Sequence, residues 1–559
     1  MHQLFSVKPE SRRIAVVNEQ GLPLPRSGQY GLALCFPGAY SLGMAHLGFQ
    51  SLFRILSEAS GWWGDRFFSD TGSRSLVAHL PLRAFHLAAF SLSFELDVFP
   101  FLLMLQQAHI PLFVEKRQEE DPLVLVGGPL VMLNPEIVAP FVDVAVVGEA
   151  EVILPQILAV WAFWRARGAT RKEVKLALSR IPGVYVPEFY TPVYEGGVLR
   201  AFETSHGVPF PVCRQWANLE DFETRTFIYT PLAYFRNTAL VELNRGCRYR
   251  CRFCAGSCIY APFRQRSLEL VLSMIRKVLE WQPEKVGFVG SDVLGYPAFP
   301  EVVHFLRSSG KKLTLSSLVG KDLYGRSDLL ELLRKGGLET ITLAPETGDV
   351  SFRLFLGKGL SNDDWLELIL ECLRVGFARV KLYFMLGKPD ATSIEADLEF
   401  LARLVRLIPS PSRLWVSYSF LIPKPHTFLE DCRAESFGRW KREKEVFERG
   451  LRKMRVAFSG ESPRRAWVEL ILARGDRALA RCLPELLEGE RFLSLPSWRR
   501  ILSALGRDEH EWPRLPWREG LKPWSVVRLW ALRDGEGRSH EGLCGPEHRT
   551  GAGNHCCRL

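Results

Sequence analysis

Three cysteines near the middle of the chain carry the most specific chemistry in the sequence. Cys247, Cys251 and Cys254 follow one another with the spacing C-x3-C-x2-C, and Phe253 precedes the last of them. Three thiolates in one short loop can bind three irons of a [4Fe–4S] cluster. The fourth iron then has no protein ligand and can chelate a small molecule. The spacing therefore predicts an iron–sulfur site that is open to a further ligand.

Other metal chemistry is an alternative for the same cysteines. A structural zinc site usually combines two ligand pairs that are well separated in sequence. Cys258 could supply a fourth sulfur, but all four ligands would then crowd one loop. A ferredoxin-type run differs in its first spacing and in its proline, and a disulfide framework does not suit a chain of this size. An open cluster is the favoured interpretation, with zinc or electron-transfer iron–sulfur as alternatives.

Strands and helices alternate on the carboxyl-terminal side of this loop. Six strands are expected, at 239–243, 285–290, 312–317, 340–344, 380–385 and 414–420, with helices between them. Six parallel strands with intervening helices predict a partial (β/α)6 barrel, whose active site lies at the carboxyl ends of the strands.

The amino-terminal third alternates in the same way. Strands are expected at 30–36, 87–93, 122–126 and 142–147, with helices at 42–57 and 98–108. Strand–helix alternation of this kind predicts a doubly wound parallel sheet. Such sheets bind ligands at the carboxyl ends of their strands.

The cysteine run and the segments that end the barrel strands together resemble the radical S-adenosylmethionine (SAM) family. Gly290-Ser291-Asp292, Pro345-Glu346-Thr347-Gly348 and Leu386-Gly387-Lys388-Pro389 follow the cysteines in the order expected for that family. The resemblance implies that the open iron binds the methionine end of SAM, and that reductive cleavage yields a 5'-deoxyadenosyl radical. It implies SAM contacts at Gly290, Ser291, Asp292, Ser316, Glu346, Thr347 and Gly387.

The amino-terminal domain resembles the Rossmann-like domain of cobalamin-binding radical SAM proteins of undefined substrate. The matching segments are 36–44, 91–97, Gly127-Gly128-Pro129, and Asp143 with Gly148-Glu149. His46 is the nearby histidine, but the Asp-x-His-x-x-Gly pattern that ligates cobalt is not in register around it. A doubly wound domain retained without a ligand is the alternative. The resemblance implies cobalamin contacts at Ser41, Gly43, Ser91, Ser93, Gly127, Gly128 and Glu149.

The fold class expected from these patterns is α/β: a doubly wound Rossmann-like domain, a partial (β/α)6 barrel and a mostly helical carboxyl-terminal region. The expected boundaries are 1–166 for the cobalamin-type domain, 167–238 for a connector with a hairpin turn at 195–197, 239–435 for the barrel, 436–533 for the helical region, and 534–559 for a disordered tail.

Composition places few limits on partners. The 559-residue chain has a net charge of +10, a hydrophobic content of 47% and a charged content of 24%, which are ordinary values for a globular protein. Its basic character permits an anionic partner such as RNA. Six arginines surround the cysteines, either as solvated cations or as a positive wall; they are Arg245, Arg248, Arg250, Arg252, Arg264 and Arg266.

The expected location is the cytoplasm. The first residues lack the apolar core of a signal peptide, and the longest apolar run, near 152–164, is too short to span a bilayer. We therefore expect no membrane association, and the 12 cysteines to be reduced. The expected reductant is a protein of the flavodoxin or ferredoxin type, and the substrate is unknown.

Three functions are compatible with these features. The first is a radical SAM enzyme that uses cobalamin to transfer a methyl group to an unactivated carbon. The second is a cobalamin-independent radical SAM enzyme such as an RNA-modifying one, although only Cys35 and Cys213 precede the barrel and a second cluster needs three further cysteines. The third is a metal-stabilised binding protein without catalytic activity.

Overall fold

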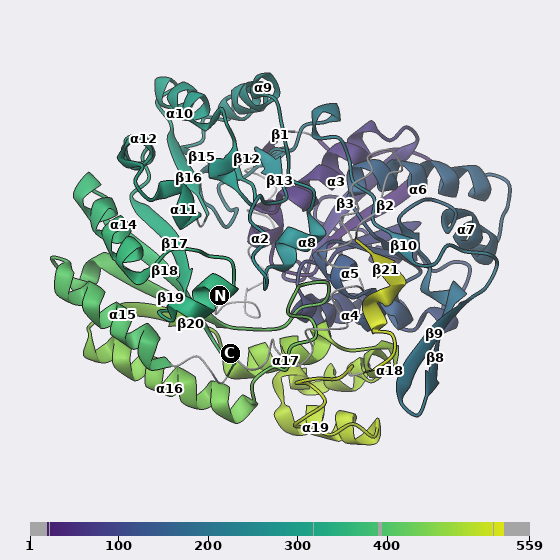
Figure 1. Ribbon diagram of the computed structural model, residues 1–559. Coiled ribbons are helices and arrows are strands. Elements are labelled where there is room, and N and C mark those ends of the chain that lie inside the picture. Colours follow the sequence, from purple (N-terminus) through teal and green to yellow (C-terminus); the bar gives the residue numbers. More distant parts are fainter. Residues whose placement is uncertain (1–18, 22, 317, 390–393, 518, 530–559) are drawn as a thin grey trace, which may run out of the picture. The chain divides into compact units, whose positions relative to one another are not determined.

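The computed structural model describes residues 19–21, 23–316, 318–389, 394–517 and 519–529 (Figure 1). These residues form two compact units. The first unit contains the described residues up to Leu240, together with Leu472–Glu509 and those from Trp517 onward. The second contains Val241–Ile471 and His510–Pro516.

The first unit is built on a six-stranded sheet with the order β3-β2-β4-β5-β6-β7. The pairs β2–β3, β2–β4, β4–β5 and β5–β6 are parallel, and β7 is antiparallel to β6. This order is that of flavodoxin-like doubly wound sheets. In such sheets the first and third strands are neighbours, and the order in which strands are added reverses between them. The predicted doubly wound sheet is therefore confirmed. Its strands are β2 (Tyr30–Phe36), β3 (Trp62–Phe68), β4 (Leu87–Ser91), β5 (Leu123–Gly127), β6 (Val144–Val146) and β7 (Val184–Tyr185).

Strand β3 was not expected from the sequence, because its apolar run is interrupted by two charged residues. Asp65 and Arg66 are both buried, at 2% exposure each. The Asp65 carboxylate accepts hydrogen bonds from the backbone N–H groups of Val77 and Ala78, and Arg66 forms an ion pair with Glu19 at 2.7 Å. Buried charges are tolerated when they are paired in this way, and the pairing residues are remote in sequence.

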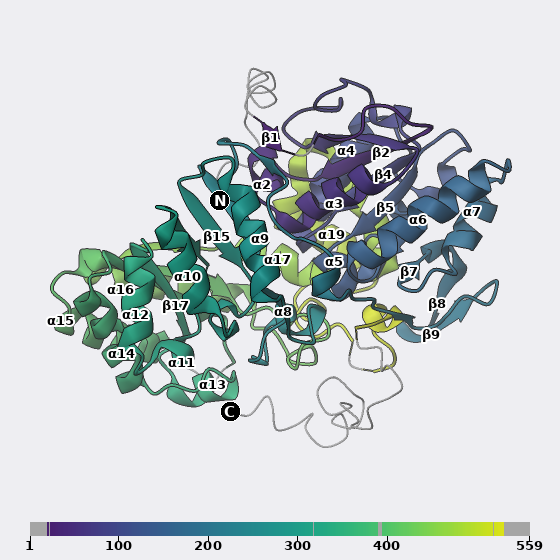
Figure 2. The same cartoon turned by 90° about the horizontal axis from the view of Figure 1, so that it is seen from above.

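The helices of this unit largely follow the expected positions. The single helix expected at 42–57 is two helices, α2 and α3, separated at Ala45 and His46. Helices α3 and α6 pack against each other, as do α6 and α7 (Figure 2). The helices are α2 (Tyr40–Met44), α3 (Leu47–Glu58), α4 (Val98–Gln107), α5 (Pro129–Leu133), α6 (Ala150–Arg165), α7 (Arg171–Leu178), α18 (Arg477–Arg481) and α19 (Leu495–Ala504).

Shorter strands complete the first unit. The expected hairpin is confirmed: β8 (Tyr190–Glu195) pairs antiparallel with β9 (Val198–Thr204). Two further pairs are β1 (Gln20–Gly21) with β11 (Ile228–Tyr229), and β10 (Val212–Cys213) with β21 (Val527–Arg528). The segment Leu472–Glu509 is linked to the rest of the first unit by an ion pair at 2.9 Å between Arg477 and Glu136.

The second unit contains two sheets, ordered β12-β15-β16 and β17-β18-β19-β20. Strands β15 and β16 are parallel, the four strands of the other sheet are parallel, and an isolated bridge joins Leu318 to Leu343. The six expected strands are present. They are β12 (Thr238–Glu242), β15 (Lys285–Val289), β16 (Lys312–Leu315), β17 (Thr340–Glu346), β18 (Arg379–Leu386) and β19 (Leu414–Phe420).

The region after the barrel is mostly helical, as predicted, but it also contains a strand that was not expected, β20 (Ala457–Gly460). It pairs parallel with β19 and extends the sheet by one strand. Its four residues are largely exposed and include no apolar run, so local pattern alone did not reveal it. A short edge strand of this kind is defined by its neighbour rather than by its own sequence.

Helices flank these strands; α10, α12, α14, α15 and α16 run along the outer side of the strands in Figure 1. Helix α14 shows why they begin and end where they do: Ser361 and Asp364 form a capping box, and Gly376 ends the helix with φ 101°. No helix in the described part of the chain is long and apolar enough to cross a membrane. The helices are α8 (Ala255–Ile259), α9 (Leu268–Leu279), α10 (Phe299–Ser308), α11 (Gly320–Leu323), α12 (Ser327–Lys335), α13 (Val350–Phe355), α14 (Asn362–Val375), α15 (Ile394–Leu407), α16 (Phe437–Lys453) and α17 (Pro463–Ala473).

Candidate active site

The three cysteines lie in a loop that leaves and rejoins the second unit at one point. The loop is closed by the antiparallel pair β13 (Asn244–Arg245) and β14 (Arg264–Gln265). Cys254 is the N-cap residue of α8, and its backbone N–H donates to the carbonyl of Cys251 at 3.0 Å. Two of the three thiols are therefore fixed by local backbone structure.

The three thiols are free and partly exposed. Burial raises the pKa of Cys247 to about 11, and the charges of Asp292, Cys251 and Cys254 contribute in the same direction. Burial also raises the pKa of Cys251, while the ammonium group of Lys358 opposes that shift. The three sulfurs thus lie within electrostatic reach of one another. A donor set of three soft thiolates fits an iron–sulfur cluster, which would hold them deprotonated.

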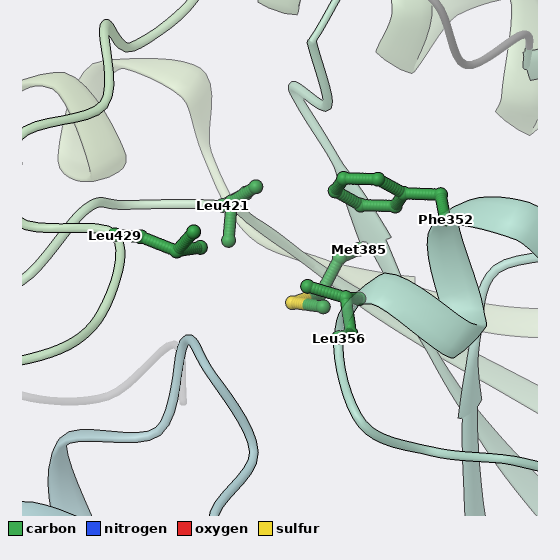
Figure 3. Packing of buried hydrophobic residues seen from close by; sticks show 5 residues of the cluster. All are labelled: Phe352, Leu356, Met385, Leu421 and Leu429. Atoms are coloured by element: carbon green, nitrogen blue, oxygen red, sulfur yellow. The ribbon is translucent and has the colours of Figure 1, made fainter. Parts of the chain in front are cut away.

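A small apolar cluster supports this loop from the barrel side. It consists of Phe352, Leu356, Met385, Leu421 and Leu429, which point toward one another in Figure 3. Phe253, the aromatic residue of the cysteine motif, packs against it. The backbone N–H of Arg252 also donates to the Leu356 carbonyl at 3.2 Å. The aromatic position of the motif therefore anchors the loop by packing a partly buried ring against this cluster.

Glu346, a predicted SAM contact, lies at the end of β17 and is directed at a lysine. Its carboxylate forms an ion pair with Lys358 at 2.8 Å. The side chains are 9% and 20% exposed respectively, so the pair is largely shielded from water. The Lys358 ammonium also lies 5.7 Å from the centre of the Phe253 ring. This places Glu346 beside the cysteine loop, with a protein cation as its partner, and its assignment to SAM stays a prediction.

Asp292, another predicted SAM contact, lies beside Cys247 and is also paired. Arg248 donates from its Nε to Asp292 at 2.6 Å and from a terminal nitrogen to Asp322 at 3.2 Å. The side chain of Asn244 donates to the Asp292 carbonyl at 2.7 Å. The Oδ1 atom of Asn244 is buried and has no hydrogen-bond partner, and a Cβ on Gly290 would lie 2.3 Å from this atom. Ser291 is exposed at the same strand end.

Thr347 and Gly387 are instead part of the internal packing. The Thr347 hydroxyl is fully buried and donates to Asp397 at 2.7 Å, and Asp397 is also ion-paired with Lys388. Gly387 has φ 72°, and a Cβ there would lie 2.3 Å from the indole nitrogen of Trp440. Its N–H donates to Glu443 at 2.7 Å. Ser316 is exposed after β16. Among the described residues, Thr347, Gly387 and Ser316 form no hydrogen bond or ion pair with the cysteine loop, and their assignment to SAM stays a prediction.

The residues predicted to contact cobalamin lie mostly at one edge of the first unit's sheet. Ser41 is in α2 after β2, Ser91 and Ser93 are at the end of β4, and Gly127 and Gly128 are at the end of β5. The strands β2 and β4 flank the point where the sheet order reverses, which is where ligands bind in doubly wound folds. A Cβ on Gly128 would lie 2.4 Å from the Leu92 carbonyl, and one on Gly43 would lie 2.5 Å from the Phe68 ring. These two glycines therefore serve close packing within the unit.

His46 lies at this edge but has both ring nitrogens engaged. Nδ1 accepts a hydrogen bond from the Phe49 N–H at 3.1 Å, and thereby caps helix α3. Nε2 lies 3.2 Å from the Ser93 hydroxyl. Because Nδ1 is the acceptor, the neutral ring carries its proton on Nε2. Burial lowers the pKa of His46 and favours this neutral form.

Glu149 and Asp143 are structural in this arrangement. Glu149 is 6% exposed, forms an ion pair with Arg214 at 3.2 Å, and accepts the Ala217 N–H at 3.0 Å. Gly148, next to it, forms a bridge with Gln215. The Glu149 carboxylate is therefore bound by residues of the segment that follows the hairpin. Asp143 lies at the start of β6, at the opposite end of the strand, in a buried network with Arg117 and Arg171.

Lys358 was missed by reasoning from the sequence, and Arg248 was expected only as one of a group of cations around the cysteines. Lys358 stands between two glycines after the Glu346 segment, and Arg248 is one of six arginines around the cysteines. The sequence around each of these residues does not distinguish a cation of the site from a solvent-exposed one. Among the described residues, no group of three or more His, Cys, Asp or Glu side chains is placed to hold a single metal ion.

Two family models match the chain. One, described as radical SAM proteins, N-terminal, matches residues 48–187, and the other, the radical SAM superfamily, matches residues 241–401. Residues 241–401 therefore form a radical SAM domain, and the cofactors of that superfamily are a [4Fe–4S] cluster and SAM. An uncharacterized protein of Methanocaldococcus jannaschii, MJ0966, is 26% identical over 486 residues, which are 86% of this chain and 96% of that protein.

The chain is also similar to solved structures that are more distant in sequence. The radical SAM methyltransferase TsrM of Kitasatospora setae, with cobalamin and a [4Fe–4S] cluster bound, is 12% identical, covers 72% of this chain and 74% of its own, and has a TM-score of 0.48. The cobalamin-dependent radical SAM enzyme OxsB, with aqua-cobalamin and SAM bound, is 13% identical, covers 90% of this chain and 79% of its own, and has a TM-score of 0.45.

Proposed function

We propose that this radical SAM protein cleaves SAM reductively to a 5'-deoxyadenosyl radical, and that it uses cobalamin to transfer a methyl group to an unactivated carbon. The observation that carries the proposal is the set of three free thiols in one loop, with Asp292 and Glu346 in electrostatic reach of them. When bound there, a [4Fe–4S] cluster supplies the electron that breaks the sulfonium bond.

The protein's own groups would position and shield this chemistry. Cys247, Cys251 and Cys254 would hold three irons, and Phe253 fixes the loop by packing on the apolar cluster. The carboxylates of Asp292 and Glu346 lie within electrostatic reach of Cys247 and Cys251 respectively and could accept hydrogen bonds from an amine. The apolar cluster would keep water from one side of the radical.

Cobalamin binding is supported by the edge of the sheet where the serines lie. Three aromatic side chains are exposed in this region: Phe94 follows Ser93 and is 64% exposed, while Tyr234 and Phe235 are 56% and 47% exposed. The Tyr234 N–H donates to the Ser41 carbonyl at 2.8 Å, so this loop lies directly over the first predicted contact. Exposed aromatic surface next to half-buried serines suits a large ligand with an apolar ring and polar side groups. His46 would not coordinate cobalt, because the lone pair on its unprotonated nitrogen, Nδ1, accepts the hydrogen bond that caps helix α3.

The test is anaerobic reconstitution of the full chain with iron and sulfide, followed by hydroxocobalamin and removal of the unbound fraction. Iron at about four per chain, with 5'-deoxyadenosine formed from SAM under dithionite, supports the radical SAM part. Corrin absorption bands retained with the protein support the cobalamin part. A cluster spectrum without corrin would refute the cobalamin part alone, and zinc without iron would refute both. The flavodoxin- or ferredoxin-type reductant and any nucleic-acid substrate stay predictions.

A further inference from the structure

The ion pair between Lys358 and Glu346 is unusual in its setting. Glu346 has a left-handed backbone conformation, with φ 68°, which a residue with a side chain adopts at a cost. Such conformations persist when the surroundings over-determine them, and they gather at functional sites. Here the strained backbone directs a carboxylate, which is 9% exposed, onto the Lys358 ammonium at 2.8 Å.

The position of Lys358 relative to the cysteine loop is fixed from several directions. Its N–H donates to the Arg353 carbonyl at 3.1 Å, and its ammonium lies 5.7 Å from the centre of the Phe253 ring. Leu356, two residues before it, belongs to the apolar cluster on which Phe253 packs (Figure 3). The charge of Lys358 is therefore held in a poorly hydrated place, within electrostatic reach of Cys251 and Cys254.

We propose that Lys358 is the counter-charge of the cysteine loop: a positioning residue whose ammonium group, fixed by Glu346, favours uptake of the electron that starts the reaction. This inference rests on the proposed cluster. The step adds one electron to the cysteine-bound cluster and removes one from an external donor of the flavodoxin or ferredoxin class. Added negative charge is stabilised by a nearby cation, and most strongly where water is excluded.

The other charges near the loop do not serve this role equally. Arg248 is shared between Asp292 and Asp322, which leaves that group with an excess of negative charge. Arg252 stacks between Phe355 and Phe428, at 4.5 and 4.4 Å from the ring centres. Its guanidinium is thereby held on the aromatic rings. Lys358 instead follows Gly357, where a Cβ would lie 3.7 Å from the Cys251 Cα, so this segment lies directly against the cysteine loop.

The experiment is a redox titration of the reconstituted full-length protein, followed by electron paramagnetic resonance, with iron content measured for each variant. K358M is expected to keep its iron and to lower the ratio of reduced to oxidised cluster, at a fixed potential, by about tenfold. A change of this order is expected when one unit charge is removed from a poorly hydrated place, and for a one-electron step a tenfold change corresponds to about 59 mV. E346Q is expected to move the ratio in the opposite direction, and K358R to stay within about twofold of the wild type.

Lys424 provides the matched control, because it forms a similar ion pair with Glu469 at 2.6 Å, with side chains 16% and 21% exposed. K424M is expected to leave the midpoint unchanged. The proposal is overturned if K358M and E346Q leave the midpoint unchanged or shift it in the same direction. K358M could lose its iron. The proposal is then upheld if K358R keeps its full iron content and E346Q has a raised midpoint. Loss of iron in all three variants overturns the proposal. A wild-type protein that takes up no iron would instead refute the proposed function.

Discussion

Replacing Asp143 by asparagine tests whether this residue supports the fold rather than a ligand. Its carboxylate is fully buried and accepts hydrogen bonds from Arg117 at 2.7 Å, Arg171 at 2.7 Å and the Val124 N–H at 2.9 Å. Asparagine keeps the shape but removes the charge, and Arg117, whose side chain is 0% exposed, then loses its ion-pair partner. Removing one member of a buried ion pair costs about 3–5 kcal/mol of the free energy of unfolding.

The same network predicts a dependence on pH. Burial alone would raise the pKa of Asp143, but the charges of Arg117, Arg171 and Lys175 outweigh it and lower the pKa below its ordinary value. The folded state therefore favours the ionised carboxylate. Its contribution is present above the pKa of the unfolded chain, about 4, and is lost as the pH falls through the lower folded value. The D143N variant should lack this part of the acid sensitivity.

Urea unfolding of the full-length protein, followed by circular dichroism, measures both effects. The control is E58Q, since Glu58 pairs with Arg54 at the same distance of 2.7 Å but is 61% exposed. An exposed pair of this kind contributes at most about 0.5 kcal/mol. The reasoning is refuted if D143N and E58Q have the same unfolding midpoint, or if D143N is as stable as the wild type at neutral pH while losing corrin binding.

Three further predictions concern the sites and their surroundings. C251A should abolish 5'-deoxyadenosine formation, whereas C213A, which alters a thiol outside the loop, should retain it; product from C251A would contradict the cluster assignment. H46A should lower stability by about 1 kcal/mol through loss of the helix cap, while corrin retention in the spectral assay stays at the wild-type level; a lost corrin would show that His46 binds it. Burial, together with Glu469, raises the pKa of Glu461 to about 7. The folded state therefore favours the protonated carboxyl, and this stabilisation is complete below about pH 4.5 and lost as the pH rises through 7. In E461Q, the urea midpoint should depend less on pH between 5 and 8 than it does in the wild type. An unchanged dependence on pH would count against this assignment.

The sequence by itself determined the class of chemistry and the order of the elements. Spacing alone identifies the three cysteines, because a short loop brings its own residues together whatever the rest of the chain does. Periodic apolar runs predicted the doubly wound sheet and the six barrel strands, since such runs must be buried by their neighbours. Strands β3 and β20 were missed because one carries buried charges and the other has no apolar run.

Only the tertiary structure decided which side chains face one another. Glu346 was predicted from its motif, but its partner Lys358 emerged only when the loop after α13 was folded back on the cysteine motif. Glu149 and Thr347 matched family segments, yet their polar groups are used by Arg214 and Asp397. Local spacing encodes a cluster loop directly. Ion pairs and hydrogen bonds between distant segments depend on distances and burial that one-dimensional patterns do not contain.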